Sequence, residues 1–98
     1  MANYFLTNKA VEDLSEIWEY TFQTWSEAQA DKYYKQLLDL CKMISADPQI
    51  GKVYDQIDTT ILGHRASHHI IFYRINFGEV EILRILHGRM DLKNRLQE

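Results

Sequence analysis

The sequence predicts an α+β domain in which a hairpin of two helices packs on a small antiparallel sheet, in the order β-α-α-β-β-β. Three observations support this prediction: a short apolar run opens the chain, two stretches with helical spacing follow, and three β-like runs fill residues 59–87. A chain of 98 residues suits one domain, so we expect a single domain over residues 1–98.

The first helix is expected after an opening strand at residues 4–7, with Thr7 or Asn8 as its N-cap. Apolar residues then recur at steps of three and four, with Ile17 and Thr21 alongside: Val11, Leu14, Trp18, Phe22 and Trp25. This stripe is predicted to face the core. The acidic residues mostly off the stripe are predicted to form a solvated face: Glu12, Asp13, Glu16 and Glu19.

A second helix is predicted to begin at Ser26, because Ser26 and Gln29 have the spacing of a capping box. Its apolar stripe is joined by Tyr33, Leu38 and Leu40 and comprises Ala30, Tyr34, Leu37, Cys41 and Ile44. The connection around residues 24–26 is so short that the two helices must be antiparallel. Asp47 and Pro48 should end the second helix, because the residue before proline is disfavoured in the α region.

Three strands are predicted at Thr59–Leu62, Ser67–Ile75 and Glu79–His87, after a loop over residues 49–58. A turn centred on Phe77-Gly78 would join the last two as a hairpin. That register places opposite charges face to face, Arg74 against Glu81, which is favourable. It also pairs Phe72 with Leu83, Ile70 with Ile85, and Ile71 with Arg84. A short final helix could start at Asp91.

Both faces of the predicted hairpin are largely apolar, whereas a two-helix layer can cover only one of them. We assign to the helix-facing side Ile71, Tyr73, Ile75, Val80 and Ile82, and expect Arg84 on this side to extend toward solvent. The other face would consist of Ile70, Phe72, Arg74, Leu83, Ile85 and His87. This second face needs a cover, which could be the C-terminal segment, a second copy or another protein.

Charge and composition restrict the function classes. The net charge is −3, with a net −5 in residues 1–60 and +2 in residues 61–98, which argues against a protein that coats nucleic acid. We see no signal peptide and no apolar run long enough to span a membrane. The single cysteine, Cys41, cannot form an internal disulfide, which fits a reducing compartment. We therefore expect a cytoplasmic protein.

The residues capable of chemistry do not form a specific motif. Four histidines lack the companion ligands and spacing of a metal site, so we expect no metal and no cofactor. Metal-free ribonuclease chemistry would need an acid, a base and cations for the phosphate. Such a set could be drawn from Arg65, His69, Arg84, His87 and Arg89. From the residues alone, this ribonuclease reading remains open beside a binding role.

The last strand and the residues after it resemble the C-terminal signature of ParE toxins, a branch of the RelE/ParE superfamily of toxin–antitoxin modules. The specific part is the run Arg-Ile-Leu-His-Gly-Arg-Met-Asp at residues 84–91. The opening strand, residues 10–17 and residues 69–75 fit the same family, so that the resemblance covers nearly the whole chain. It implies the same β-α-α-β-β-β order.

The resemblance also implies a function and two partners. ParE-like toxins poison DNA gyrase on cleaved DNA, and a ParD-like antitoxin inactivates them by laying a C-terminal segment across the toxin. We therefore expect a hetero-oligomer with antitoxin, no direct reading of nucleic acid and no membrane. The antitoxin is a natural cover for the second face. The expected partner-binding residues are Arg65, Ile70, Phe72, Arg74, Leu83, Ile85, His87, Arg89 and Met90.

The other branch of the superfamily resembles RelE and cleaves messenger RNA on the ribosome. Ile70 stands where RelE-like enzymes often carry a catalytic arginine, and the C-terminal end lacks their usual tyrosine. The acidic net charge also disfavours docking on ribosomal RNA. We therefore expect a binding poison with no catalytic residues, and keep a ribosome-dependent mRNA interferase as the alternative.

Overall fold

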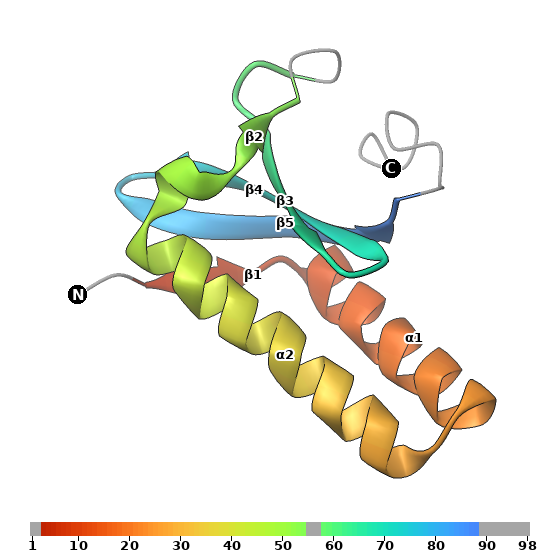
Figure 1. The fold of residues 1–98 in the computed structure, drawn as a ribbon. Coiled ribbons are helices and arrows are strands. Elements are labelled where there is room, and N and C mark those ends of the chain that lie inside the picture. The colour runs from red at the N-terminus through yellow and green to blue at the C-terminus, as the bar shows by residue number, and fades with distance from the viewer. Residues whose placement is uncertain (1–2, 55–57, 89–98) are drawn as a thin grey trace.

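The helices and the sheet form two layers. The computed structural model describes residues 3–54 and 58–88. Helices α1 (Asn8–Thr24) and α2 (Glu27–Ala46) run antiparallel along one face of the sheet, and the far end of their hairpin extends past it (Figure 1). The predicted α+β fold is therefore confirmed. The final helix expected from Asp91 lies outside the described residues.

The sheet has five strands in the order β1-β5-β4-β3-β2 and is mixed, not purely antiparallel. The strands are β1 (Tyr4–Leu6), β2 (Lys52–Val53), β3 (Leu62–Ala66), β4 (His69–Asn76) and β5 (Glu79–His87). β1 pairs in parallel with β5, and the other pairs are antiparallel. The sequence analysis missed β2, which is too short to give an alternating pattern, and placed β3 too early, at Thr59–Leu62.

Local sequence chemistry sets the helix ends as predicted. The Thr7 hydroxyl accepts a hydrogen bond from the Ala10 N–H at 3.1 Å, and the Ser26 hydroxyl accepts one from the Gln29 N–H at 3.1 Å. Helix α2 ends at Ala46, and Pro48 begins a 3-10 turn, Pro48–Ile50. The short link between α1 and α2 produces the expected antiparallel helical hairpin.

The main core lies between the helices and the sheet. Its buried members are Ala10, Leu14, Leu37, Cys41, Ile44, Ala66, Ile71, Tyr73, Val80, Ile82 and Ile85. The α2 stripe faces this core as predicted, except that Tyr34 is exposed. The α1 stripe was centred wrongly, because Val11, Phe22 and Trp25 are 48%, 43% and 75% exposed. Leu14 is buried as predicted, and the other buried residues of α1 are small or polar: Ala10, Asp13 and Thr21.

The β4–β5 hairpin follows the predicted register only up to a β-bulge. The turn has positive φ at Phe77 (52°) and Gly78 (78°), as a two-residue hairpin turn requires, and Ile75–Val80 and Tyr73–Ile82 pair as predicted. Beyond them Phe72 pairs with Arg84, so Leu83 is an extra residue on β5. The predicted pairs of Ile70, Ile71 and Phe72 are therefore wrong.

The bulge changes which face later β5 residues occupy. Ile85 pairs with Ile71 and is buried in the helix-side core, whereas it was predicted on the opposite face. Leu86 takes the opposite face instead, beside Ile70 and Phe72. Ile75, predicted to be covered by the helices, is 45% exposed near the hairpin turn.

Helix α1 replaces β1 as the neighbour of β5 once β1 ends. The Thr7 hydroxyl donates to the Leu83 carbonyl at 2.8 Å, and the Ile85 N–H donates to Oδ2 of Asp13 at 3.0 Å. Arg84 donates to the same carboxylate through Nε to Oδ2 (2.8 Å) and Nη2 to Oδ1 (3.0 Å). Asp13 is only 7% exposed. The prediction that Asp13 is solvated was therefore wrong, as was the expected extension of Arg84 to solvent.

The second face of the sheet is covered in part by the chain itself. Ile70, Phe72 and Leu86 form a separate buried cluster, against which Tyr54 and Ile61 pack. The Tyr54 and Phe72 rings meet edge to face, with centroids 5.1 Å apart. Tyr54 directly follows β2, in the region predicted as a loop over residues 49–58, and Ile61 directly precedes β3, in the region predicted as a strand at Thr59–Leu62.

We expect Asp13→Ala to lower the free energy of unfolding by about 3–5 kcal/mol, because it leaves the buried Arg84 guanidinium without its counter-charge. Urea denaturation at pH 7 measures this loss. Glu12→Ala, next to Asp13 but exposed, is the matched control and should change stability by less than about 0.5 kcal/mol. Equal stability losses in the two variants would contradict the structural role given to the Asp13–Arg84 pair.

Candidate functional site

The predicted partner-binding residues do not form one continuous exposed surface. Arg74 is exposed and donates through Nε to Oε1 of Glu81 at 2.6 Å, which confirms the predicted cross-strand pairing. Arg65 is exposed on β3, near the end of the sheet that holds His87 and Gly88. Leu83 and His87 are partly buried. Arg89 and Met90 lie outside the described residues.

Three of the predicted apolar contacts are buried. Ile70 and Phe72 are 4% and 0% exposed beneath Tyr54 and Ile61. Ile85 is 2% exposed and faces the helices. A partner could reach Ile70 or Phe72 only if the segment carrying Tyr54 moved aside, and it could not reach Ile85 from that face.

A cluster of histidines occupies the end of the sheet where the β3–β4 turn meets the end of β5. His69 and His87 are directly paired across β4 and β5, with ring centroids 5.4 Å apart. His68, in the turn, lies nearly parallel to His87 at 6.2 Å. The Gly88 N–H donates to the His68 carbonyl at 3.0 Å and so holds the end of β5 to the turn. The sequence analysis had drawn two of these histidines, His69 and His87, into its ribonuclease alternative.

Tyr33 of α2 connects this cluster to the helices, a role that its position in an apolar stripe did not indicate. Its hydroxyl donates to the Ala66 carbonyl at 3.0 Å and lies 2.7 Å from Nδ1 of His69. Both contacts are satisfied when Nδ1 of His69 carries the proton and donates to the Tyr33 oxygen. Burial lowers the pKa of His69 to about 4, and repulsion from His87 and His68 adds to the effect. His69 is therefore neutral near pH 7.

The chemistry available to the described residues is limited. Neutral His69 is a weak base, and the Arg84 guanidinium on the neighbouring strand is held by Asp13. Within residues 3–54 and 58–88, no set of three histidine, cysteine or acidic side chains is arranged to hold a metal ion. Cys41 is buried, and burial raises the pKa of its thiol to about 12, so it is a core residue and a poor nucleophile.

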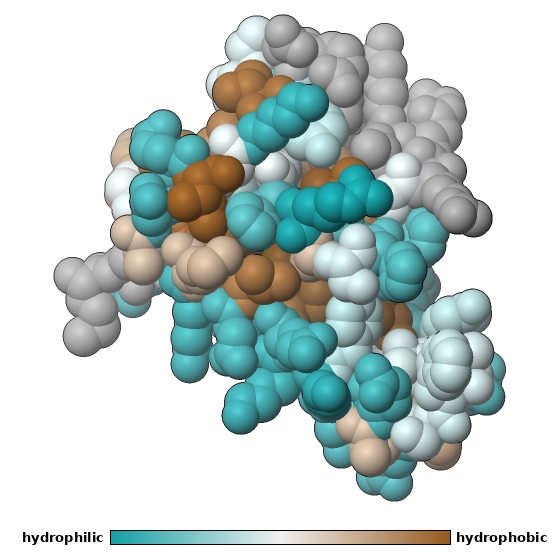
Figure 2. Space-filling view, viewed as in Figure 1, coloured by the Kyte–Doolittle hydropathy of each residue, from teal (hydrophilic) through white to brown (hydrophobic). Residues whose placement is uncertain are grey.

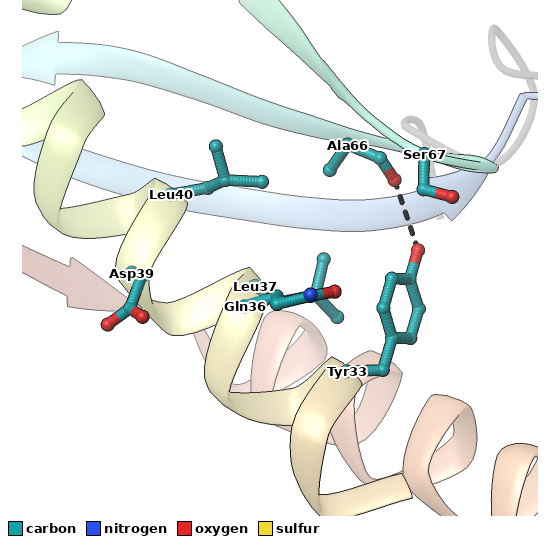
Figure 3. A pocket seen from close by; sticks show the side chains of 7 residues that line it. All are labelled: Tyr33, Gln36, Leu37, Asp39, Leu40, Ala66 and Ser67. Atoms are coloured by element: carbon teal, nitrogen blue, oxygen red, sulfur yellow. Dashed lines mark hydrogen bonds between the residues drawn. The ribbon is translucent and has the colours of Figure 1, made fainter. Parts of the chain in front are cut away.

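A shallow groove of about 300 Å³ lies between α2 and the end of β3. Its walls are Tyr33, Gln36, Leu37, Asp39, Leu40, Ala66 and Ser67. In Figure 3 the Tyr33 ring stands between α2 and the strand end at Ala66, with Leu37 and Leu40 beneath the strands. The groove thus combines an apolar floor with polar groups at its rim.

Exposed apolar residues gather on the helices, where the sequence analysis had predicted core. Val11, the partly buried Trp18 and Phe22 fall within about 40° of one another around α1, and the exposed Trp25 follows as its C-cap. Trp18 and Phe22 meet edge to face at 5.2 Å, and Nε1 of Trp18 donates to Oδ1 of Asp31 at 2.9 Å. Figure 2 shows further hydrophobic residues where α2 meets the sheet. The far end of the helical hairpin, below them in this view, is mostly hydrophilic or near neutral. No helix within the described part of the chain has the length and apolar character to cross a membrane.

Comparison with known proteins identifies the family. Residues 4–92 match the family model described as the ParE toxin of the type II toxin–antitoxin system parDE. The chain belongs to the ParE toxin family. It is 33% identical over 96 residues to Toxin ParE1 of Mycobacterium tuberculosis, which covers 97% of this chain and 98% of that protein. It is also 32% identical over 99 residues to Toxin ParE of Escherichia coli, covering 100% of this chain and 96% of that protein.

Chains in two solved structures of toxin–antitoxin systems share the fold. A chain of the chromosomal ParDE system from P. aeruginosa superposes with a TM-score of 0.78 at 19% identity, covering 89% of this chain and 96% of that one. A chain of the RelBE2 toxin–antitoxin complex from Mycobacterium tuberculosis gives a TM-score of 0.57 at 20% identity, covering 88% and 96%. The family resemblance drawn from residues 84–91 is therefore confirmed, together with the fold it implied.

We expect the stability of the toxin to fall as the pH drops from about 6.5 toward 4. Unfolded His69 takes up a proton near its ordinary pKa of 6.5, whereas the folded state resists protonation until about 4. The stabilisation is thus complete above pH 6.5. After allowance for solvent screening of this half-buried group, the loss by pH 4 is about 1–2 kcal/mol.

Denaturation curves between pH 7 and pH 4 measure this loss. His69→Asn should remove that part of the pH dependence, and His68→Asn, in the exposed turn, should leave most of it in place, because burial of His69 is the largest cause of its lowered pKa. Identical pH profiles for the wild type and His69→Asn would show that His69 does not carry the effect.

Proposed function

We propose that this ParE-family toxin acts in the cytoplasm by binding and poisoning DNA gyrase, and that a ParD-like antitoxin neutralises it in a hetero-oligomer. The observation that carries the proposal is the family membership, because the match spans residues 4–92 and the curated relatives are matched over nearly their whole length. The solved neighbours come from toxin–antitoxin systems, which supports an antitoxin partner.

The state of Arg84 supports a binding poison over a phosphodiesterase. Its guanidinium makes two hydrogen bonds with the Asp13 carboxylate, and the two side chains are 11% and 8% exposed. Moving Arg84 onto a phosphate would break this pair and leave Asp13 buried and unpaired, which is costly. Ile70, at the position where RelE-like enzymes often carry an arginine, is a buried apolar residue.

The surface available to the two partners differs from the one expected from the sequence. Arg65, Arg74 and His87, with Arg89 and Met90 beyond the described part of the chain, remain proposed contacts. Ile85 is no longer among them, because it packs against the helices. The exposed residues Val11, Phe22 and Trp25, with the partly buried Trp18 between them, add an apolar surface, since large exposed apolar patches commonly mark interaction sites.

The histidine cluster favours an mRNA interferase as the second candidate function. His69 and His87 are adjacent, Tyr33 fixes the orientation of His69, and Arg65 is exposed nearby. A base, an acid and a cation are what metal-free RNA cleavage needs. The pKa of His69 near 4 makes it a weak base at neutral pH, which counts against this candidate.

We expect the purified toxin to accumulate gyrase-linked linear DNA when it is incubated with gyrase and supercoiled plasmid. In parallel, translating ribosomes given the same toxin should keep intact mRNA. Heat-unfolded toxin is the control for both reactions. Cleaved mRNA with unaffected gyrase would reverse the proposal and make the protein an enzyme.

Substitutions of His87 and Arg89 separate the two mechanisms further. A binding surface loses affinity through several positions, so His87→Ala and Arg89→Ala should each weaken gyrase poisoning by about tenfold or less. The exposed Lys35→Ala on α2 serves as control. Loss of RNA cleavage by more than about a thousandfold with His87→Ala alone would instead assign that histidine a catalytic role.

A further inference from the structure

The turn between β4 and β5 carries a phenylalanine in a backbone conformation that suits other residues better. Phe77 has a φ of 52° and Gly78 a φ of 78°, so both central residues of the turn lie in the left-handed region. Two-residue turns of this kind, type I′, favour Asn-Gly, Asp-Gly or Gly-Gly. A bulky side chain is uncommon in the left-handed region, because its Cβ crowds the following carbonyl oxygen. Phe77 therefore lowers the stability of the turn relative to asparagine.

The side chain of Phe77 does not offset this strain by packing. Its exposed fraction is 100%, whereas that of Trp25, the next most exposed large hydrophobic residue of the described chain, is 75%. A methyl group on Gly78 would meet no atom within 4 Å beyond its chain neighbours, so the tip of the turn stands clear of the domain. Single exposed apolar residues are ordinary on protein surfaces. A strained one that contributes nothing to the fold instead points to a function.

The charges of the hairpin favour a protein as the partner of this tip over nucleic acid or an anionic membrane surface. Glu79, directly after the turn, is exposed and negative. Arg74, the basic residue of the hairpin nearest to the turn along the chain, is paired with Glu81 at 2.6 Å. Binding to phosphates relies on available lysine and arginine side chains. Within the described hairpin, residues 69–87, the tip therefore lacks the charge that a phosphate surface requires.

The shape of the tip indicates a folded partner. A single protruding ring is buried only if the partner supplies a cavity, and aromatic anchors in such pockets carry much of the binding free energy of protein interfaces. The expected antitoxin segment is laid across the toxin, a mode that fits grooves and faces. A segment that becomes ordered on binding has no pocket of its own beforehand. The tip therefore suits a preformed pocket on a folded protein.

A second copy of the toxin is a poorer partner for the tip. The shallow groove between α2 and β3, about 300 Å³ in volume, would have to accept Phe77 of the next copy. Such a contact joins two different surfaces of the same chain. It therefore repeats from copy to copy and produces rings or filaments instead of a closed pair.

We propose that Phe77 anchors the toxin to its target enzyme by inserting the tip of the β4–β5 hairpin into an apolar pocket on that enzyme. This inference rests on the proposed function, which makes DNA gyrase the target. Ile75, 45% exposed and two residues before Phe77, adds apolar surface beside the anchor. The turn lies at the opposite end of β5 from His87 (Figure 1), about 25 Å away at the rise of a β-strand. The tip is thus a contact separate from His87.

Phe77→Asn separates a binding role from a folding role. Asparagine suits the turn, so the melting temperature should stay the same or rise by up to about 4 °C. With gyrase and supercoiled plasmid, the toxin concentration that gives half-maximal gyrase-linked linear DNA should rise about tenfold or more. Phe77→Leu keeps an apolar side chain on the same backbone and should raise this concentration by about threefold or less.

Two controls restrict the effect to the tip and to the target. Tyr20→Ala removes another exposed ring, 69% exposed on α1, and should leave the half-maximal concentration unchanged. The second control is the product of the reading frame next to the toxin gene, purified and titrated by calorimetry as the antitoxin. Its affinity for Phe77→Asn should lie within about threefold of its affinity for the wild type.

The outcomes separate this inference from the function on which it rests. Wild-type poisoning by Phe77→Asn would overturn the anchor and leave gyrase as the target. A melting temperature lowered by Phe77→Asn would assign Phe77 to folding, and a tenfold loss of antitoxin affinity would assign the tip to the antitoxin; either result would reject the inference. A wild-type toxin that leaves gyrase unaffected would overturn the proposed function and the inference together.

Discussion

The structure depends on one carboxylate, that of Asp13. β1 is only three residues long, so β5 continues for several residues with no strand of the described part of the chain on that side. Asp13 covers this exposed backbone by accepting the Ile85 N–H, and the same carboxylate neutralises Arg84. One side chain of α1 therefore joins the helix layer to β5 and balances the charge of the arginine on that strand. The functional consequence is that Arg84 is held in an internal ion pair and is not available to bind a phosphate.

The sequence was sufficient for the parts of the fold that local chemistry determines. Helix ends are set by hydrogen bonds and steric effects within a few residues, at Thr7, Ser26 and Asp47-Pro48. The opposite charges of Arg74 and Glu81 likewise indicated the register of the hairpin near its turn. The bulge at Leu83 was not predictable, because alternation carries no mark of an extra residue. Asp13 was misread for a related reason: the partner that makes its burial acceptable is 71 residues away in the chain.

Predictions about the candidate site were also partly right and partly wrong. The run at residues 84–91 was the specific part of the resemblance that predicted the family, and the match over residues 4–92 confirms that prediction. The assignment of a binding face was less successful, because the C-terminal segment, a second copy and another protein were considered as covers for Ile70 and Phe72, and the segment between β2 and β3 was not. Tyr54 and Ile61 cover them from a segment without regular hydrophobic periodicity. Exposure was instead found on α1, where large aromatic residues were taken for core because size and hydrophobicity alone do not distinguish a buried helix face from a docking face.

The bulge at Leu83 has a consequence for comparing or recombining toxins of this family. It inverts the parity of β5, so that Ile85 belongs to one layer and Leu86 to the other. A chimaera can be joined within this strand to a donor that lacks the extra residue. The β5 residues after the junction would then face the opposite layer, even if the flanking sequences match. A single misplaced gap in an alignment through residues 82–86 therefore assigns the later residues of β5 to the wrong layer.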